Sequence, residues 1–335
     1  MVNRCRSIHI ICRSILLCVA VSSLSCSSPP ATQHYRPLYL IVENNRYGYI
    51  TRQGEVVIQP QYFEAGDFAE GLAEVKLQEK YGYIDTTGTM VIEPQFDFAQ
   101  PFHNGLAAIN INGLYGYIDT SGEMVIEPQY DLAWEFTSPL ARVNVQGKFG
   151  YINQEGSYVV EPRYPDAGKF SEGFAAVNVD GLYGYINTSG SLVIEPRFQF
   201  AWMFTEDKAA VRIQDQYGYI DSVGDIIIEP TFDRANHFSE GLAVVKLGDK
   251  YGYIDSGGNM SIEPEFDYAT SFSEGMGMVR IGDLCGYVNM WGKMVVEPRF
   301  EEAKTYYGGI ALVKEDGLWK YIDTKGKIIY QPEHP

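Results

Sequence analysis

Cysteine, basic charge and long apolar runs are all scarce in this sequence of 335 residues. Four of the five cysteines lie in the first 26 residues, which leaves Cys285 alone in the rest of the chain, and no Cys/His spacing suits a metal site. The formal net charge is −17, and without the first 25 residues 23 basic side chains face 43 acidic ones. So acidic a protein repels phosphate backbones, which argues against nucleic acid as a partner.

Sequence signatures of catalysis are also missing. Of the five histidines, only His103 and His237 lie in the connectors of the repeats described below, and they occupy different positions of the repeat. Neither has a neighbouring Ser or Cys in a nucleophile-elbow pattern, and no H-E-x-x-H, P-loop or EF-hand motif occurs. We therefore expect no catalytic residue, no metal and no cofactor.

The beginning of the chain differs from the rest. Three arginines in residues 4–13 precede a short apolar run, residues 15–21, and small residues follow it. A charged start, a short apolar core and small residues indicate a secretory signal peptide over residues 1–25. The apolar core is too short to span a bilayer as a stable helix.

The signal peptide ends in a candidate lipidation site. Ser23-Leu24-Ser25-Cys26 resembles the lipobox of bacterial lipoproteins, except that the leucine lies two residues before the cysteine instead of three. We expect Cys26 to carry a lipid that anchors the protein to a membrane, with plain secretion as the alternative. Residues 26–37 then form a flexible tether, and Cys285 has no partner for an intramolecular disulfide.

A period of 34 residues dominates the remainder of the chain. A glycine recurs at this step from Gly48 to Gly286, and Lys320 takes its ninth position; a proline recurs from Pro60 to Pro332 without a miss. Nine copies without insertion or deletion indicate one repeat array over residues 38–335, despite a length that would otherwise suggest two domains. We call each position shared by the copies a slot.

Each copy reads as three short strands. Residues 106–111 alternate between apolar and polar side chains, which predicts a strand buried on one side only. Asn112-Gly113 predicts a type I′ hairpin turn, and the glycine of Asp85-Thr-Thr-Gly88 fits the left-handed position of a bulged hairpin loop. The third strand, residues 90–93, is expected to stop at Pro94, which has no N–H for a ladder.

The fold class is therefore all-β, a tandem array of nine three-stranded antiparallel meanders. The connector after each meander is either a short fourth strand or a single helical turn. Because three short strands cannot bury enough apolar surface alone, each copy must pack on its neighbours. We expect an open, solenoid-like array, with a closed propeller-like ring as the alternative; the first and last copies both look complete, which argues against a ring closed by a blade shared between the termini.

The repeat resembles a known family. Tyr-Gly-Tyr-Ile-Asp-x-x-Gly, a Val-Ile-x-Pro strand and Phe-x-x-Gly-Leu-Ala-x-Val are similar to the WG repeats, also called KWG repeats, of bacterial proteins. The aromatic-Gly pair is the hallmark, although the usual Trp is Tyr or Phe here and the single Trp in that slot, Trp319, precedes Lys320. The resemblance covers residues 38–332. It implies an interaction module and supplies no chemistry.

Recurring carboxylates form one candidate site. Stacked copies would align the glutamates that precede the prolines, from Glu93 to Glu297, and the turn aspartates, and such a row can bind Ca²⁺. We expect instead that the aspartates cap their turns and that the glutamates bind a neighbouring copy's backbone amide. Asn replaces Asp in several copies, and no D-x-D cluster occurs.

Slots that vary between copies are better candidates for binding a partner, because folding does not dictate them. Trp134 and Trp202 share one slot, two copies apart, and Trp291 lies in a predicted hairpin loop. Tryptophan is enriched at binding hot spots. The alternative is that Trp134 and Trp202 only fill space beside Phe136 and Phe204, and that Trp291 is a surface aromatic without a function.

The sequence thus predicts a non-enzymatic binding scaffold of the bacterial cell envelope. Its partner is an unidentified protein, peptide or glycan, it meets the membrane only through the N-terminal lipid, and it is a monomer. The alternatives are a glycan hydrolase with paired carboxylates and a purely structural spacer.

Overall fold

The computed structural model describes residues 37–332, so the predicted signal peptide, Cys26 and all of the tether before Pro37 lie outside the described residues. Within this range the chain forms 34 strands in nine antiparallel sheets. No helix of the described part is long and apolar enough to cross a membrane. Cys285 is buried and is a free thiol.

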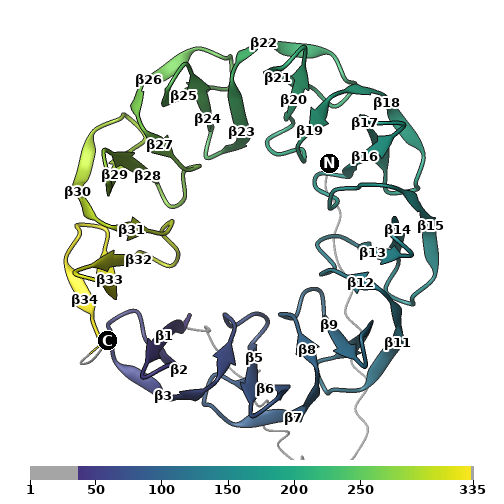
Figure 1. Cartoon of the computed structure of the whole chain (residues 1–335), viewed down its shortest axis with the longest axis vertical. Coiled ribbons are helices and arrows are strands. Elements are labelled where there is room, and N and C mark those ends of the chain that lie inside the picture. Colours follow the sequence, from purple (N-terminus) through teal and green to yellow (C-terminus); the bar gives the residue numbers. More distant parts are fainter. Residues whose placement is uncertain (1–36, 333–335) are drawn as a thin grey trace, which may run out of the picture. The chain divides into compact units, whose positions relative to one another are not determined.

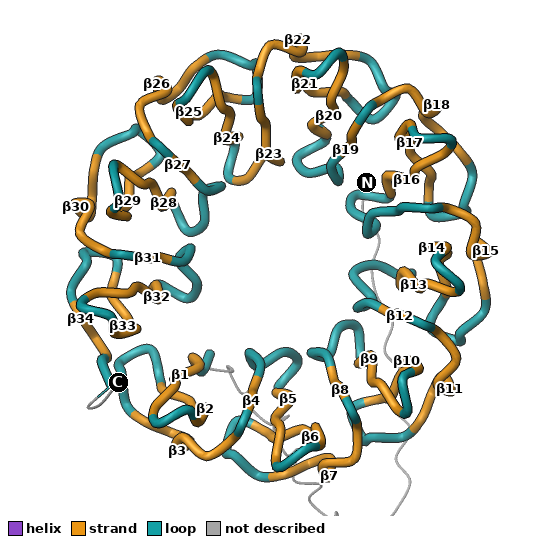
Figure 2. Tube along the Cα trace, viewed as in Figure 1, coloured by secondary structure: helices purple, strands orange, loops and turns teal. Residues whose placement is uncertain are grey.

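The nine sheets follow one another around a closed ring, a nine-bladed β-propeller (Figure 1). We number the blades 1 to 9 in chain order. Each blade has its long outer strand on the rim, and its inner turn points toward the centre of the ring (Figure 2). The prediction of an open solenoid is therefore wrong, and the ring given as the alternative is correct.

The strands of each blade have four roles. The second strands are β1 (Tyr39–Glu43), β5 (Leu72–Leu77), β9 (Leu106–Ile111), β13 (Ala141–Val145), β16 (Phe174–Val179), β20 (Ala209–Ile213), β24 (Leu242–Leu247), β28 (Met276–Ile281) and β32 (Ile310–Glu315). The third strands are β2 (Arg46–Ile50), β6 (Lys80–Asp85), β10 (Leu114–Asp119), β14 (Lys148–Ile152), β17 (Leu182–Asn187), β21 (Gln216–Ile220), β25 (Lys250–Asp255), β29 (Leu284–Asn289) and β33 (Leu318–Asp323).

The outer strands are β3 (Val56–Tyr62), β7 (Met90–Phe96), β11 (Met124–Tyr130), β15 (Tyr158–Tyr164), β18 (Leu192–Phe198), β22 (Ile226–Phe232), β26 (Met260–Phe266), β30 (Met294–Phe300) and β34 (Ile328–Tyr330). The connector supplies a short first strand in seven blades: β4 (Glu64–Ala65), β8 (Phe98–Ala99), β12 (Leu132–Ala133), β19 (Phe200–Ala201), β23 (Arg234–Ser239), β27 (Tyr268–Ala269) and β31 (Glu302–Ala303). Of the two possibilities left open for the connector, the short strand is the one observed.

The hallmark glycine permits the outer strand to cross close to the third strand. A Cβ added to any of the glycines from Gly48 to Gly286 would lie 2.3–2.5 Å from a carbonyl oxygen of the outer strand, and close to the nitrogen of the repeat's proline. Real Cβ contacts are never so short, so the slot excludes every larger residue as long as the outer strand continues past it.

The proline does not end the outer strand. β7 continues through Pro94 to Phe96, and its register with β6 shifts between the Tyr81–Phe96 and Tyr83–Ile92 pairs. A residue at such a bulge donates no ladder bond, so a proline there costs none. The predicted end of the third strand at Pro94 is therefore wrong.

Both hairpin predictions are confirmed. Asn112 and Gly113 have φ of 52° and 86°, as a type I′ turn requires, and Gly88 has φ of 85°. In the loop, the Asp85 carboxylate accepts bonds from the amides of Thr87 and Thr89 at 2.9 and 3.0 Å. The aspartates therefore cap their turns, as expected.

The prediction of one-sided burial is wrong for the second strands. In β9 the side chains of Ala107 and Ile109 are buried on one face, and Ala108 and Asn110 are buried on the other. Each blade packs face to face on two neighbours, so its middle strands have no solvent face.

A tyrosine joins each blade to the next. Tyr83 is fully buried, its ring lies 4.8 Å from that of Phe102, and its hydroxyl donates to the Gln100 carbonyl at 2.8 Å. The same bond from the third strand to the next connector recurs from Tyr49 to Tyr287. Burial of an aromatic ring with a satisfied hydroxyl makes each interface both apolar and directional.

Blades 1 and 9 close the ring without sharing a strand, since no sheet within residues 37–332 contains strands of both blades. The Tyr39 hydroxyl donates to the Gly308 carbonyl at 3.0 Å, and the Tyr321 hydroxyl donates to the Leu40 carbonyl at 2.8 Å. Tyr39 and Tyr321 are buried in a common apolar cluster with Ile310. Complete terminal blades therefore do not prevent closure, because side-chain packing and hydroxyl hydrogen bonds hold the seam without a shared strand.

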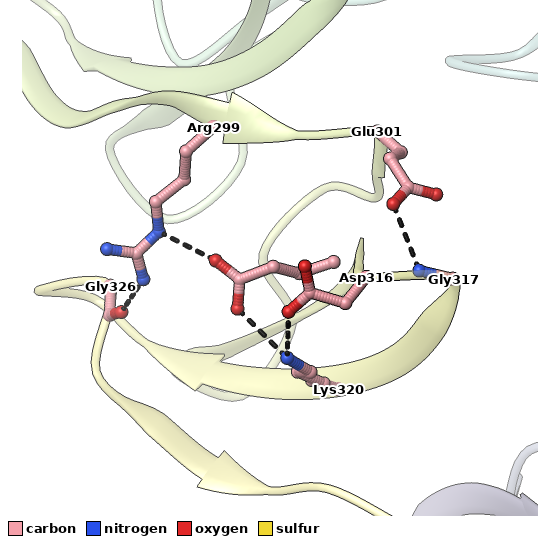
Figure 3. A network of polar contacts seen from close by, with 7 residues as sticks. Arg299, Glu301, Asp316, Gly317, Lys320 and Gly326 are labelled. Carbon is pink, nitrogen blue, oxygen red and sulfur yellow. Dashed lines mark hydrogen bonds and ion pairs between the residues drawn. The ribbon is translucent and has the colours of Figure 1, made fainter.

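The last blade accommodates Lys320 in the glycine slot because its outer strand is short. β34 ends at Tyr330 after three residues, where the other outer strands have seven. The buried Lys320 ammonium lies 3.1 Å from the Glu315 carboxylate, which also meets Arg299 of blade 8 at 3.4 Å (Figure 3). Arg299 donates to the Gly326 carbonyl at 2.7 Å, so this network also ties blade 8 to blade 9.

Candidate partner-binding site

The slot of Trp134 and Trp202 follows the short first strand and faces a fixed position on the second strand. The Trp134 amide donates to the Arg142 carbonyl at 3.1 Å, and the Trp202 amide donates to the Ala210 carbonyl at 2.9 Å. Residues paired in this way have neighbouring side chains. The combined size of the two facing side chains therefore decides whether a cavity remains at the surface of that blade.

Blade 5, between the two tryptophans, has the smallest of these pairs. Gly168 occupies the tryptophan slot, and its amide donates to the carbonyl of Ala176 at 2.8 Å. A cavity of about 250 Å³ opens over this pair, with Arg142 and Trp202 among its walls. We call this cavity the notch.

Arg142 is held against the aromatic side chains of its own blade. Its guanidinium carbon lies 4.0 Å from the ring centre of Trp134 and 5.2 Å from that of Phe149. One of its N–H groups donates to the Ala167 carbonyl of blade 5. The stacking and the hydrogen bond fix the guanidinium at the boundary between blades 4 and 5.

The other polar groups of the notch come from blade 5. The Tyr183 hydroxyl donates to the Asp166 carboxylate at 2.5 Å, and the Ala167 amide donates to the same carboxylate at 2.9 Å. Burial and the bond to Asp166 raise the pKa of Tyr183 to about 12. Lys169 is exposed and lines the notch without an ion pair among the described residues.

A smaller cavity of about 180 Å³ adjoins the notch and shares Arg142 and Lys169 with it. Trp134 and Glu135 are among its other lining residues. Trp134 and Trp202 therefore each line one of two cavities that have both cations in common.

Blade 5 also departs from the others in its connector. In blades 2 to 4 and 6 to 9 the backbone amide at one position of the connector donates to a carbonyl of the second strand, for example from Asp97 to Asn110 at 2.9 Å. In blade 5 that position is Pro165. Proline has no N–H, so the equivalent carbonyl of Asn178 receives no such bond, and blade 5 has only three strands.

Trp291, the third predicted residue, lies elsewhere. It is on the loop between β29 and β30 of blade 8, its side chain is 84 % exposed, and it lines neither cavity. Its amide donates to the Asn289 side chain at 3.1 Å, so the loop holds the indole outward.

The recurring glutamates do not behave as expected. The side chains from Glu93 to Glu297 lie exposed on the rim and accept no hydrogen bond from a neighbouring blade. A different row does: Glu240 accepts from the amides of Glu274 and Gly275 at 2.7 and 2.8 Å, and Glu70, Glu172, Glu206 and Glu274 bind the next inner turn similarly. Among residues 37–332 no three His, Cys, Asp or Glu side chains gather closely enough to hold a metal.

The sequence places Gly168 in the tryptophan slot, but two relations between facing slots went unnoticed. Arg142 replaces the small or apolar residue that most copies have opposite the tryptophan slot, and Gly168 faces the small Ala176. Comparing the two facing slots as a pair, instead of one slot at a time, would have indicated both.

Of two similar solved structures, only the first supports the architecture, and it supports nothing beyond the architecture. A crystal structure of a eukaryotic initiation factor is similar with a TM-score of 0.63 at 12% identity, covering 88% of this chain and 96% of that one. The dihydro-heme d1 dehydrogenase NirN is similar with a TM-score of 0.49 at 11% identity, covering 88% and 72%. A search of curated protein sequences finds no match.

The family model described as WG containing repeat matches residues 47–81, 81–115, 115–149, 149–183, 183–216, 217–251, 251–285 and 286–319. These matches cover most of the chain, and a WG-repeat propeller suggests a protein-interaction scaffold. The chain therefore belongs to the WG-repeat family.

Proposed function

We propose that this protein is a non-enzymatic binding scaffold of the bacterial cell envelope, and that the notch holds its partner. The observation that carries the proposal is the coincidence of two tryptophans with a cavity. Trp134 and Trp202 flank the one blade whose facing pair is Gly168 and Ala176, and both cavities open there.

The fold does not require these residues. Other blades carry Gln100, Thr270 or Lys304 in the tryptophan slot and keep the same backbone bond. Residues that folding leaves free, and that nevertheless gather aromatic and charged groups around a concave surface, are typical of binding sites.

The location at the envelope rests on the sequence. The signal-like residues 1–25 and the candidate lipid on Cys26 would hold the propeller at a membrane surface by a flexible tether. Radiolabelled palmitate incorporated into the wild-type protein but not into Cys26→Ser tests this part, and equal labelling of both would contradict it.

Crosslinking in cells that produce the full chain tests the binding function. Trp202→Ala removes one wall of the notch. Gly168→Leu fills it, and the backbone tolerates the change because a Cβ at Gly168 finds its nearest neighbour at 3.7 Å. Both variants should lose crosslinked partners that the wild-type protein retains.

Trp291→Ala is the control, because it removes an exposed indole far from the notch. Loss of the partners in this control alone would place the site on the β29–β30 loop instead. No crosslinked partner of the wild-type protein under any condition would favour a spacer over a binding scaffold.

A further inference from the structure

We infer that the notch takes an acidic peptide segment, with a carboxylate between Arg142 and Lys169 and an apolar side chain against Trp202. This inference rests on the proposed binding function and specifies the chemistry of its ligand.

Arg142 is prepared for an anion before any ligand arrives. Within residues 37–332 only one of its terminal nitrogens donates a hydrogen bond, to Ala167, and the stacking on Trp134 and Phe149 already restricts the side chain. An arginine held in this way loses little further conformational entropy when its remaining N–H groups bind a carboxylate.

Lys169 supplies the second positive charge. Its slot holds Asp67, Pro101, Glu135 or Met203 in other blades, so folding does not call for a cation there. The nearby Asp166 does not neutralise it by an ion pair, since that carboxylate is bound by Tyr183 and by a backbone amide.

The distribution of charge selects one of the two cavities. Glu135 lines the smaller cavity and is absent from the larger, whereas Arg142 and Lys169 line both. The notch, the larger cavity, has Asp166 as its own carboxylate, but that group already accepts hydrogen bonds from the Tyr183 hydroxyl and a backbone amide. The Glu135 carboxylate has no hydrogen-bond partner among residues 37–332, so a ligand carboxylate is better placed in the notch than in the smaller cavity.

The rest of the notch is apolar and small. Phe200, Trp202 and Met203 form its blade 6 side, and the ring centres of Phe200 and Trp202 are 5.2 Å apart in an edge contact. A volume of about 250 Å³ is smaller than a pocket for a complete drug-sized ligand, so it suits one or two side chains of a longer ligand.

A backbone acceptor beside the notch suits a ligand that carries a hydrogen-bond donor, and the WG-repeat fold favours a peptide over a glycan as that ligand. The Asn178 carbonyl lacks the amide donor that Pro165 cannot supply, and Asn178 pairs with Tyr183 of the notch across the sheet. A peptide brings an N–H next to its carboxylate side chain, and the WG-repeat fold itself suggests protein partners.

Fluorescence anisotropy with labelled peptides tests the inference on the full-length protein in detergent. The probes are Gly-Glu-Phe-Glu-Gly and its counterpart Gly-Gln-Phe-Gln-Gly, with labelled trigalacturonic acid as an acidic glycan. We expect the Glu peptide to bind about tenfold more tightly than the Gln peptide, as loss of one charge-assisted hydrogen bond implies.

Lys169→Gln and Arg142→Gln should each weaken binding of the Glu peptide about tenfold, and should remove most of its preference over the Gln peptide. Lys304→Gln is the matched control, an exposed lysine in the tryptophan slot of blade 9, and should leave both affinities unchanged. Lys169 is exposed, so its variant reports on charge even if Arg142→Gln perturbs the fold.

Equal affinity for the two peptides, including no binding of either, overturns the inference, and so does tighter binding of the trigalacturonic acid. If the crosslinked partners depend on Trp202 but not on Lys169, the proposed binding function stands and the acidic ligand is wrong.

Discussion

Substituting Gly184 by alanine tests the physical reason for the repeat's hallmark. The added Cβ would lie 2.4 Å from the Ile194 carbonyl oxygen and 2.8 Å from the Pro196 nitrogen. Both are backbone atoms of the outer strand, so no side chain can rotate away. Contact at an ordinary distance of about 3.5 Å requires the strand to move by about 1 Å.

Such overpacking costs about 3 kcal/mol, at the upper end of what a well-packed site loses, because the outer strand is held on both sides of Gly184 by its register with β17. At about 2 °C or more per kcal/mol, the melting temperature should fall by about 6 °C.

Thermal unfolding followed by circular dichroism measures the effect. Gly168→Ala is the control, since it adds the same methyl group in the connector of the same blade at ordinary contact distances. Melting temperatures lowered equally in the two variants would refute the steric explanation and leave only the general cost of replacing a glycine.

Three further predictions concern stability and closure. Glu74→Gln should stabilise the protein by about 1–3 kcal/mol at pH 8 but not at pH 4. Burial raises the pKa of Glu74 to about 7, so the folded protein loses stability as the pH rises from the pKa of Glu74 in the unfolded chain toward that value. Equal gains at both pH values in calorimetry would contradict this prediction. Glu240→Gln should speed amide hydrogen exchange in the next inner turn, whose two amides it binds, and unchanged exchange there would be the contrary result. Tyr321→Phe and Tyr185→Phe each remove one hydroxyl bond between two blades. Only Tyr321→Phe should raise amide hydrogen exchange in β1, because the seam between blades 1 and 9 has no peptide connector to hold it. The same rise in β1 for both variants would contradict this prediction.

The sequence predicted the local structure of each blade well. The turn at Asn112-Gly113 needs positive φ, the loop at Gly88 needs a left-handed residue, and both requirements are visible in two or three letters. The continuation of the outer strand past Pro94 was not predicted, because the β-bulge at which a proline without an N–H is tolerated depends on the register with the partner strand.

Ring closure and the notch were beyond the sequence for a common reason. The curvature of the array depends on the angle between successive blades, which is set by how Tyr83 and its equivalents pack against the next blade. A small change in this angle accumulates over nine interfaces. The notch depends on the joint size of residues that face each other, such as Gly168 and Ala176, and on a cation that reaches in from the neighbouring blade. The variation at Trp134 and Trp202 located the region, whereas Arg142 and Lys169 emerged only from the structure.

The seam between blades 1 and 9 gives the molecule a mechanical polarity. Every other pair of blades is joined by a peptide connector, whereas packing and the hydroxyl bonds of Tyr39, Tyr321 and Tyr330 hold the two ends together. Tension on the chain at Pro37 would act directly on β1, so the interface between blades 1 and 9 would open first while blade 1 stayed packed on blade 2. The ring would then open at one defined place, under a load set by that single interface.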